Sequence, residues 1–362
     1  MIKDTAQKQK AIRFCVATGA LPYLEVVVRY VADIASVEAD ISDVDVLGIR
    51  AASFGQQQKI IFDCKTQNKI GAVGRALWAA GLMQLIKADE AYVILNKAGP
   101  EGHRLAANEL GVRLTSESLF DNFGKLSSPN YAEGATYLDD VDAWSALFNL
   151  QRSNANLEAL VSFLLSTAPL ETQHTNGFRS LLSRLWKAEG EIDSRKPVHR
   201  ALWGLVVCES LRFLSSMAVE FNHVFDPALD KLQFESLLRN FVWGGRDAYI
   251  LRQKLHVQVR GAKSQEDVSQ LELPGWDRFV ELMRSLMDAP HLASSGLLPA
   301  KDLAFKELSA LPRVDADKRI AQEFAATNRG RQFLISTNKY LGSLSVHFKD
   351  SADEFAKVLA SA

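Results

Sequence analysis

The chain has 362 residues, of which 47% are apolar and 23% charged, with a net charge of −1 and an isoelectric point of about 6.7. This composition excludes a disordered chain, and the length predicts two domains rather than one core. The near-neutral charge excludes a polybasic protein, although a locally basic groove is compatible with it.

The cysteines and the apolar runs indicate the cellular compartment. Cys15, Cys64 and Cys208 are far apart in the sequence, so they favour neither a disulfide framework nor a zinc site. The first ten residues, MIKDTAQKQK, lack the apolar core of a signal peptide. The continuous apolar runs are shorter than the ~20 residues that span a bilayer. We therefore expect a cytoplasmic protein with no membrane partner.

Helices and short strands alternate in the first third of the chain. Residues 11–35 predict an amphipathic helix with a break at Gly19–Pro22. DVDVLGIRA (43–51) alternates with a period of two, and KIIFDCKT (59–66) follows the loop SFGQQQ, so the two segments predict a hairpin.

The next 50 residues continue this alternation. We expect a helix over 69–87, a strand over 90–95, a helix over 103–110 and a short strand, VRL, over 112–114. Gly111 suits the end of the third of these elements, and Ser116 or Ser118 suits the start of another helix. Strands that alternate with helices predict an α/β domain with a mixed sheet.

The second strand of the hairpin carries charges where a buried strand should not. Side chains two residues apart on a strand face the same way, so Asp63 and Lys65 project together and Cys64 faces the other side, as a small buried apolar residue. Asp45 opens the preceding strand, and pairing would bring it within roughly 5 Å of Asp63. Two carboxylates this close repel each other unless a cation lies beside them.

Mg²⁺ is the divalent cation that such a group of oxygens suits, because it prefers one or two carboxylates together with water and phosphate oxygens. Asp45, Asp63 and the backbone carbonyl of Cys64 would form a partial shell. Lys65 would then orient a water molecule or stabilise the developing negative charge. The strand therefore predicts a site for metal-assisted phosphodiester hydrolysis.

These residues resemble a known family. Glu25 in the first helix, Asp45 at the head of a strand and Asp63-x-Lys65 on the next resemble the PD-(D/E)xK nuclease superfamily, more narrowly its Mrr-like restriction endonuclease branch. The resemblance covers residues 10–120, about a third of the chain. It implies that Asp45 and Asp63 are the metal ligands and Lys65 the catalytic lysine, with Glu25 as a further metal ligand.

Two more residues are weaker candidates. Asp43 lies on the same face as Asp45 and rivals it as the first acid, and Gln67 follows the lysine as a candidate substrate contact. We prefer Asp45 to Asp43 because the apolar strand starts directly after it.

The rest of the chain predicts helices. Residues 123–137 are rich in Gly, Ser, Pro and Asn and form a candidate linker. LHVQVRG (255–261) is the one strand-like exception. Several basic residues lie near Trp186 over 179–200. We favour a solvated helix face there over a nucleic-acid binding surface. The expected helices cover 141–150, 156–165, 178–189, 197–221, 232–243, 274–287, 316–334 and the tail from 351.

The hypothesis that follows is a metal-dependent endonuclease acting on DNA. Its α/β restriction-endonuclease-like domain, with a mixed sheet, would span residues 1–125, and a mainly α-helical recognition or partner domain would span 138–362. The cofactor would be Mg²⁺, with Mn²⁺ as a substitute. Homodimerisation or a partner protein would involve the helical domain, and analogy suggests prokaryotic defence against foreign DNA.

Two alternatives stay open. One is a catalytically silent subunit that uses the nuclease fold for nucleic-acid binding or assembly, and the other is an RNA-cutting effector. The three charged residues Asp45, Asp63 and Lys65 favour an active enzyme over the silent subunit.

Overall fold

A mixed sheet forms the N-terminal part, as the sequence predicts, but it has five strands where four were expected. The computed structural model describes residues 2–30, 39–51, 57–65, 71–260 and 271–361. The spatial order of the strands follows the chain, and β1–β2 and β2–β3 are antiparallel while β3–β4 and β4–β5 are parallel. The strands are β1 (Leu21–Tyr30), β2 (Ala39–Ala51), β3 (Gln57–Lys65), β4 (Glu90–Leu95) and β5 (Val112–Ser116).

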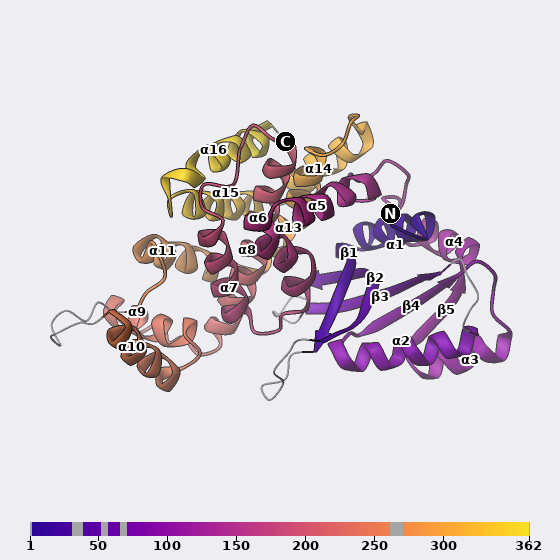
Figure 1. The fold of residues 1–362 in the computed structure, drawn as a ribbon, viewed down its shortest axis with the longest axis horizontal. Coiled ribbons are helices and arrows are strands. Elements are labelled where there is room, and N and C mark those ends of the chain that lie inside the picture. The colour runs from indigo at the N-terminus through magenta and orange to yellow at the C-terminus, as the bar shows by residue number, and fades with distance from the viewer. Residues whose placement is uncertain (1, 31–38, 52–56, 66–70, 261–270, 362) are drawn as a thin grey trace.

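Helices cover both faces of this sheet (Figure 1). One face carries α1 (Thr5–Ala17) and α4 (Glu117–Ser127), and the other carries α2 (Ala72–Ile86) and α3 (Glu101–Glu109). The predicted capping at Ser116 is confirmed, since its hydroxyl accepts a hydrogen bond from the amide of Leu119. Covering both faces explains why β3 and β4 read as continuous apolar runs.

An aromatic cluster fixes α1 and α4 on their face of the sheet. Phe14 of α1 contacts Phe62 of β3, Tyr92 of β4 and Phe120 of α4, with ring centroids 5.4–6.0 Å apart. Aromatic pairs in this range stabilise a core beyond their buried area. The N-terminal end of α1 is thereby positioned over the end of β3, beside the candidate site.

The predicted helix over residues 11–35 is wrong in its second half. Helix α1 ends at Ala17, and LEVVVRY forms the edge strand β1, which pairs with β2. Three consecutive valines favour a strand, because branching at Cβ restricts the side chain in a helix. Val26 and Val28 are buried and Val27 is half-buried, so β1 is apolar at consecutive positions.

The C-terminal part is an assembly of helices around α8 (Pro197–Asn222), which packs against α7, α11, α12, α13, α15 and α16. Among the described helices, α8 alone has the length and composition of a membrane span, and 94% of that apolar window is buried inside the protein. The remaining elements are α5 (Val141–Ser153), α6 (Ala155–Ser162), a π-helical turn (Phe163–Thr167), a 3₁₀ turn (Ala168–Leu170), α7 (His174–Lys187), α9 (Lys231–Val242), α10 (Arg246–Arg260), α11 (Trp276–Met287), α12 (Pro290–Ser295), α13 (Leu297–Lys306), α14 (Val314–Ala326), α15 (Asn328–Gly342) and α16 (Val346–Ser361).

Two expectations for this part are corrected. The predicted strand LHVQVRG is helical through Arg260, the end of α10, and Gly261 lies outside the described residues. The single helix expected over 316–334 is two helices that meet at Thr327. The candidate linker is also shorter than expected, because α4 continues to Ser127.

The helical part packs along the outer edge of the sheet. Strand β1 contacts the π-helical turn, the 3₁₀ turn and α13. An edge strand that is covered in this way cannot pair with another chain. The same contact places α5 and α6 opposite the ends of β1 and β2, so both parts of the chain contribute walls to the candidate site.

Candidate metal-binding and catalytic site

The structure brings the three sequence-predicted charges together at the end of the hairpin. Val46 pairs with Phe62, so Asp45 and Asp63 occupy the next positions on the two strands. The Lys65 ammonium lies 2.9 Å from Asp45 Oδ2 and 3.7 Å from Asp63 Oδ1. The Cys64 amide donates a hydrogen bond of 2.7 Å to Asp45 Oδ2. Spacing on a strand and hairpin pairing therefore predicted this group from sequence.

Glu25 reaches the same group from β1 and not from a helix. Its neighbours Leu24 and Val26 pair with Val46 and Val44, which leaves Glu25 opposite Asp45. Its φ of 54° lies in the left-handed region, which is rare for a residue other than glycine. Such a conformation interrupts the alternation of the strand. The surrounding sheet must therefore hold Glu25 in place.

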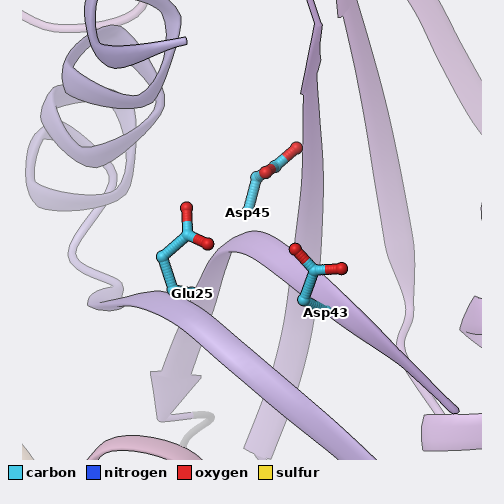
Figure 2. A group of neighbouring side chains, drawn as sticks. All are labelled: Glu25, Asp43 and Asp45. Carbon is cyan, nitrogen blue, oxygen red and sulfur yellow. The ribbon is translucent and has the colours of Figure 1, made fainter. Parts of the chain in front are cut away.

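Three carboxylates form the compact acidic group of the site, as Figure 2 shows. One oxygen each from Glu25, Asp43 and Asp45 lies within 4.8 Å of the other two. Two oxygens bound to one Mg²⁺ at 2.0–2.1 Å are at most about 4.2 Å apart, so a small closure would suit the ion. These hard oxygen donors fit Mg²⁺ or Mn²⁺. Asp43, which the sequence placed second to Asp45, belongs to this group.

Asp63 lies outside that acidic group. The Arg75 guanidinium of α2 donates to both of its carboxylate oxygens, at 2.7 and 3.0 Å. Burial raises the pKa of Asp63, and the Arg75 contact opposes that rise. Arg75 was not among the sequence candidates. Its place in the first turn of a helix that follows the acid-bearing strand was the available signal.

Lys8 is the second residue that the sequence analysis missed. Its ammonium lies 2.9 Å from Asp45 Oδ1 and forms an ion pair with Glu25, and its side chain is 3% exposed. The signal was its position on α1, where Ala11, Ile12 and Cys15 follow at helical spacing and are all buried. A lysine on the buried stripe of a helix requires a partner inside the protein.

Opposite charges set the protonation of the site. Burial lowers the pKa of Lys8 and of Lys65. The nearby carboxylates together outweigh it, Asp45 with Glu25 at Lys8 and Asp45 with Asp63 at Lys65, so the pKa of each lysine lies above its ordinary value. Burial raises the pKa of Glu25, against the Lys8 ammonium. Both lysines therefore carry positive charge at neutral pH, and in that state each can donate hydrogen bonds but cannot accept a proton.

The site lies at the base of a cleft between the sheet and the helical part. The cleft has a volume of about 830 Å³, and α5 and α6 line the wall opposite the carboxylates. Asp45 is 3% exposed, while Asp43 lies at the accessible surface. The cleft also has a cationic rim. Apart from Lys8 and Lys65, which contact Asp45, the cationic residues that line the cleft are Lys3, Arg29 and Arg152, and all three are exposed.

The other residues that the sequence singled out either do not belong to the acidic group or lie outside the described residues. Gln67 lies outside the described residues. The Cys64 side chain is fully buried, as expected, and burial raises the pKa of its thiol well above the ordinary value. In the helical part, the Arg179 guanidinium donates to the Val242 carbonyl and packs over the Trp243 ring, so it stabilises a helix junction.

Comparison of the chain with protein families, with curated proteins and with solved structures found no match.

Proposed function

We propose that this protein is a metal-dependent nuclease that hydrolyses phosphodiester bonds of DNA at the Asp45–Lys65 site. The observation that carries the proposal is the contact of Lys65 with Asp45, one of three clustered carboxylates, at the base of a cleft with a cationic rim. The resemblance of Asp45 and Asp63-x-Lys65 to PD-(D/E)xK nucleases, in a mixed sheet flanked by helices, supports the same assignment.

Different residues would have different roles in the hydrolysis. Glu25, Asp43 and Asp45 would hold Mg²⁺ or Mn²⁺, which when bound supplies charge for the pentavalent transition state and lowers the pKa of water. Lys65 donates toward the reacting phosphate, held in place by Asp45. The Cys64 amide fixes the Asp45 carboxylate, so the Lys65 ammonium points to a defined place. Lys3, Arg29 and Arg152 would contact the phosphodiester backbone at the cleft rim.

The test is cleavage of supercoiled plasmid with Mg²⁺, Mn²⁺ or EDTA, with single-stranded DNA and RNA run alongside. We expect cleavage that requires the metal and that Lys65→Ala lowers by about 10²–10³-fold, because the developing charge loses a donor. Lys125→Ala is the matched control, since Lys125 is 64% exposed on α4. Equal cleavage by both variants would overturn the role of Lys65. Cleavage of RNA alone would replace the DNA assignment, and the proposed role in defence against foreign DNA would fall with it.

One observation favours a second candidate, a silent nuclease-fold subunit that binds nucleic acid or assembles with a partner. Lys8, Lys65 and Arg75 already neutralise Glu25, Asp45 and Asp63 within the protein. A site that is balanced in this way can be purely structural. Absence of Mn²⁺ binding, together with absence of cleavage of every substrate, would favour this candidate.

A further inference from the structure

An ammonium group occupies the position between two of the three clustered carboxylates. Lys8 Nζ contacts one oxygen of Asp45 at 2.9 Å and forms an ion pair with Glu25. The acidic group thus already binds one cation, supplied by the chain itself. This protein cation shows that the pocket is charged and shaped for a small positive ion.

The helix that carries Lys8 is firmly anchored. Gln7 Nε2 donates to the Lys65 carbonyl at 3.4 Å, and Lys10 Nζ lies 2.7 Å from Glu117 of α4. Arg13 Nε lies 2.5 Å from Asp139. These contacts on successive turns fix α1 against the sheet and against the chain after α4. Lys8 can therefore leave the carboxylates only by rotation of its own side chain.

A divalent cation and the Lys8 ammonium cannot share these oxygens. A metal ion bound to Glu25 and Asp45 would lie about 2.0–2.1 Å from oxygens that the ammonium now contacts. Because the ammonium lies 2.9 Å from the same Asp45 oxygen, the two cations would be at most about 5 Å apart. Two positive charges so close repel strongly in a site that is poorly exposed to water. Binding of the metal therefore requires that Lys8 moves away.

We propose that Lys8 is a built-in competitor for the divalent cation, which binds Glu25 and Asp45 only by displacing the Lys8 ammonium. This inference depends on the metal site of the proposed function and adds its regulation. The displaced ammonium stays in the same cleft, which Lys8 lines, and there a nucleic-acid phosphate can pair with it. Phosphate and metal binding are then coupled, because each stabilises the arrangement that the other requires.

The test compares Mn²⁺ affinity, measured by calorimetry without nucleic acid, between the wild type, Lys8→Met and Lys8→Gln. We expect both variants to bind Mn²⁺ at least about tenfold more tightly, because no ammonium must be displaced. The matched control is Lys10→Met, two residues away on the same helix and paired with Glu117 outside the acidic group. Its affinity should equal that of the wild type. Unchanged or weaker binding in both Lys8 variants would overturn the proposal.

Thermal unfolding with and without Mn²⁺ covers the case in which the variants are unstable, since loss of Lys8 leaves buried carboxylates unpaired. We expect Mn²⁺ to raise the Tm of Lys8→Met more than that of the wild type. Failure of both variants to fold at any Mn²⁺ concentration would show a purely structural lysine and overturn the proposal.

Cleavage separates this inference from the proposed function. Tighter Mn²⁺ binding in the Lys8 variants of a protein that cuts no nucleic acid would support the inference and overturn the nuclease. Metal-dependent cleavage by the wild type, with unchanged affinity in the Lys8 variants, would do the reverse.

Discussion

The carboxylates of the site differ in what they contact, and this difference separates two ligand sets. Asp43 and Glu25 share the acidic group with Asp45, whereas Asp63 is held by the Arg75 guanidinium. The family resemblance implies Asp45 and Asp63 with Glu25 as a further ligand, while the geometry favours Asp45 with Glu25 and Asp43. Substitution of single carboxylates distinguishes the two sets.

Asp43→Asn should weaken Mn²⁺ binding by about tenfold, because the cation loses one charged oxygen from its shell. Calorimetry with Mn²⁺ measures this change. Asp40→Asn is the control on the same strand, since Asp40 is 69% exposed and pairs with Arg29. A large loss in Asp63→Asn without one in Asp43→Asn would contradict the geometric set and would require Arg75 to release Asp63 when the metal binds.

The sequence alone was sufficient to predict those site residues that lie on one strand or on its hairpin partner. Asp63 and Lys65 lie two apart on one strand, and Asp45 lies on its hairpin partner, so strand periodicity and hairpin pairing together bring them close. Lys8 reaches the group from a helix packed on the sheet, and Arg75 reaches it from another element. The local pattern marks Lys8 as buried and Arg75 as close to the end of β3. Which carboxylate each one meets depends on how the layers pack, and no local pattern encodes that choice.

At the scale of elements, strand β1 forms where a helix was predicted, and this difference has the largest consequence for the site. It places Glu25 directly across from Asp45, whereas a helix would have presented it from a layer above the sheet. The opposite error occurred at LHVQVR, where alternation predicted a strand but α10 formed. Apolar periodicity is ambiguous over such short segments, and tertiary contacts decide the outcome.

A pair of substitutions at Glu25 tests the strand and its unusual backbone. Glu25→Gly should be more stable than Glu25→Ala by about 0.5–1 kcal/mol, because alanine is strained at positive φ and glycine is not. In a helix the order would be reversed, with alanine favoured by a similar amount. Both variants lose the ion pair with Lys8, so that loss cancels in the comparison. Denaturant midpoints of the two variants measure the difference, and a more stable alanine variant would contradict the assigned backbone.

At the scale of the whole molecule, a buried polar network joins the sheet to the helical part. The Tyr23 hydroxyl of β1 donates to Glu209 of α8, and Arg212 lies 2.7 Å from the same carboxylate. The Lys301 ammonium of α13 lies 3.2 Å from the centroid of the Tyr23 ring. This network holds the strand that carries Glu25 against the helices, so the cleft geometry depends on both parts of the chain.

Lys301 makes this junction sensitive to pH. Burial, with some help from the Arg212 guanidinium, lowers the pKa of Lys301 to about 8, from an ordinary value of 10.5. Between these two values the unfolded chain binds a proton that the folded protein does not, so the contribution of Lys301 to stability rises with pH across this window. Below pH 8 both states carry the proton, and the cost of burying the charge is fully present.

Lys301→Met should therefore be more stable than the wild type at pH 7, by about 1–3 kcal/mol, because an apolar side chain of similar length replaces a buried charge. The advantage should shrink as the pH rises from 8 to 10.5 and level off above 10.5, where the wild-type amine is neutral in both states. Denaturant unfolding across this range measures the difference in the free energy of unfolding. Lys306→Met, on the same helix and 42% exposed, should show no such trend. A pH-independent difference at Lys301 would mean that its amine keeps its proton in the junction, held there by the Tyr23 ring and the Glu209 carboxylate.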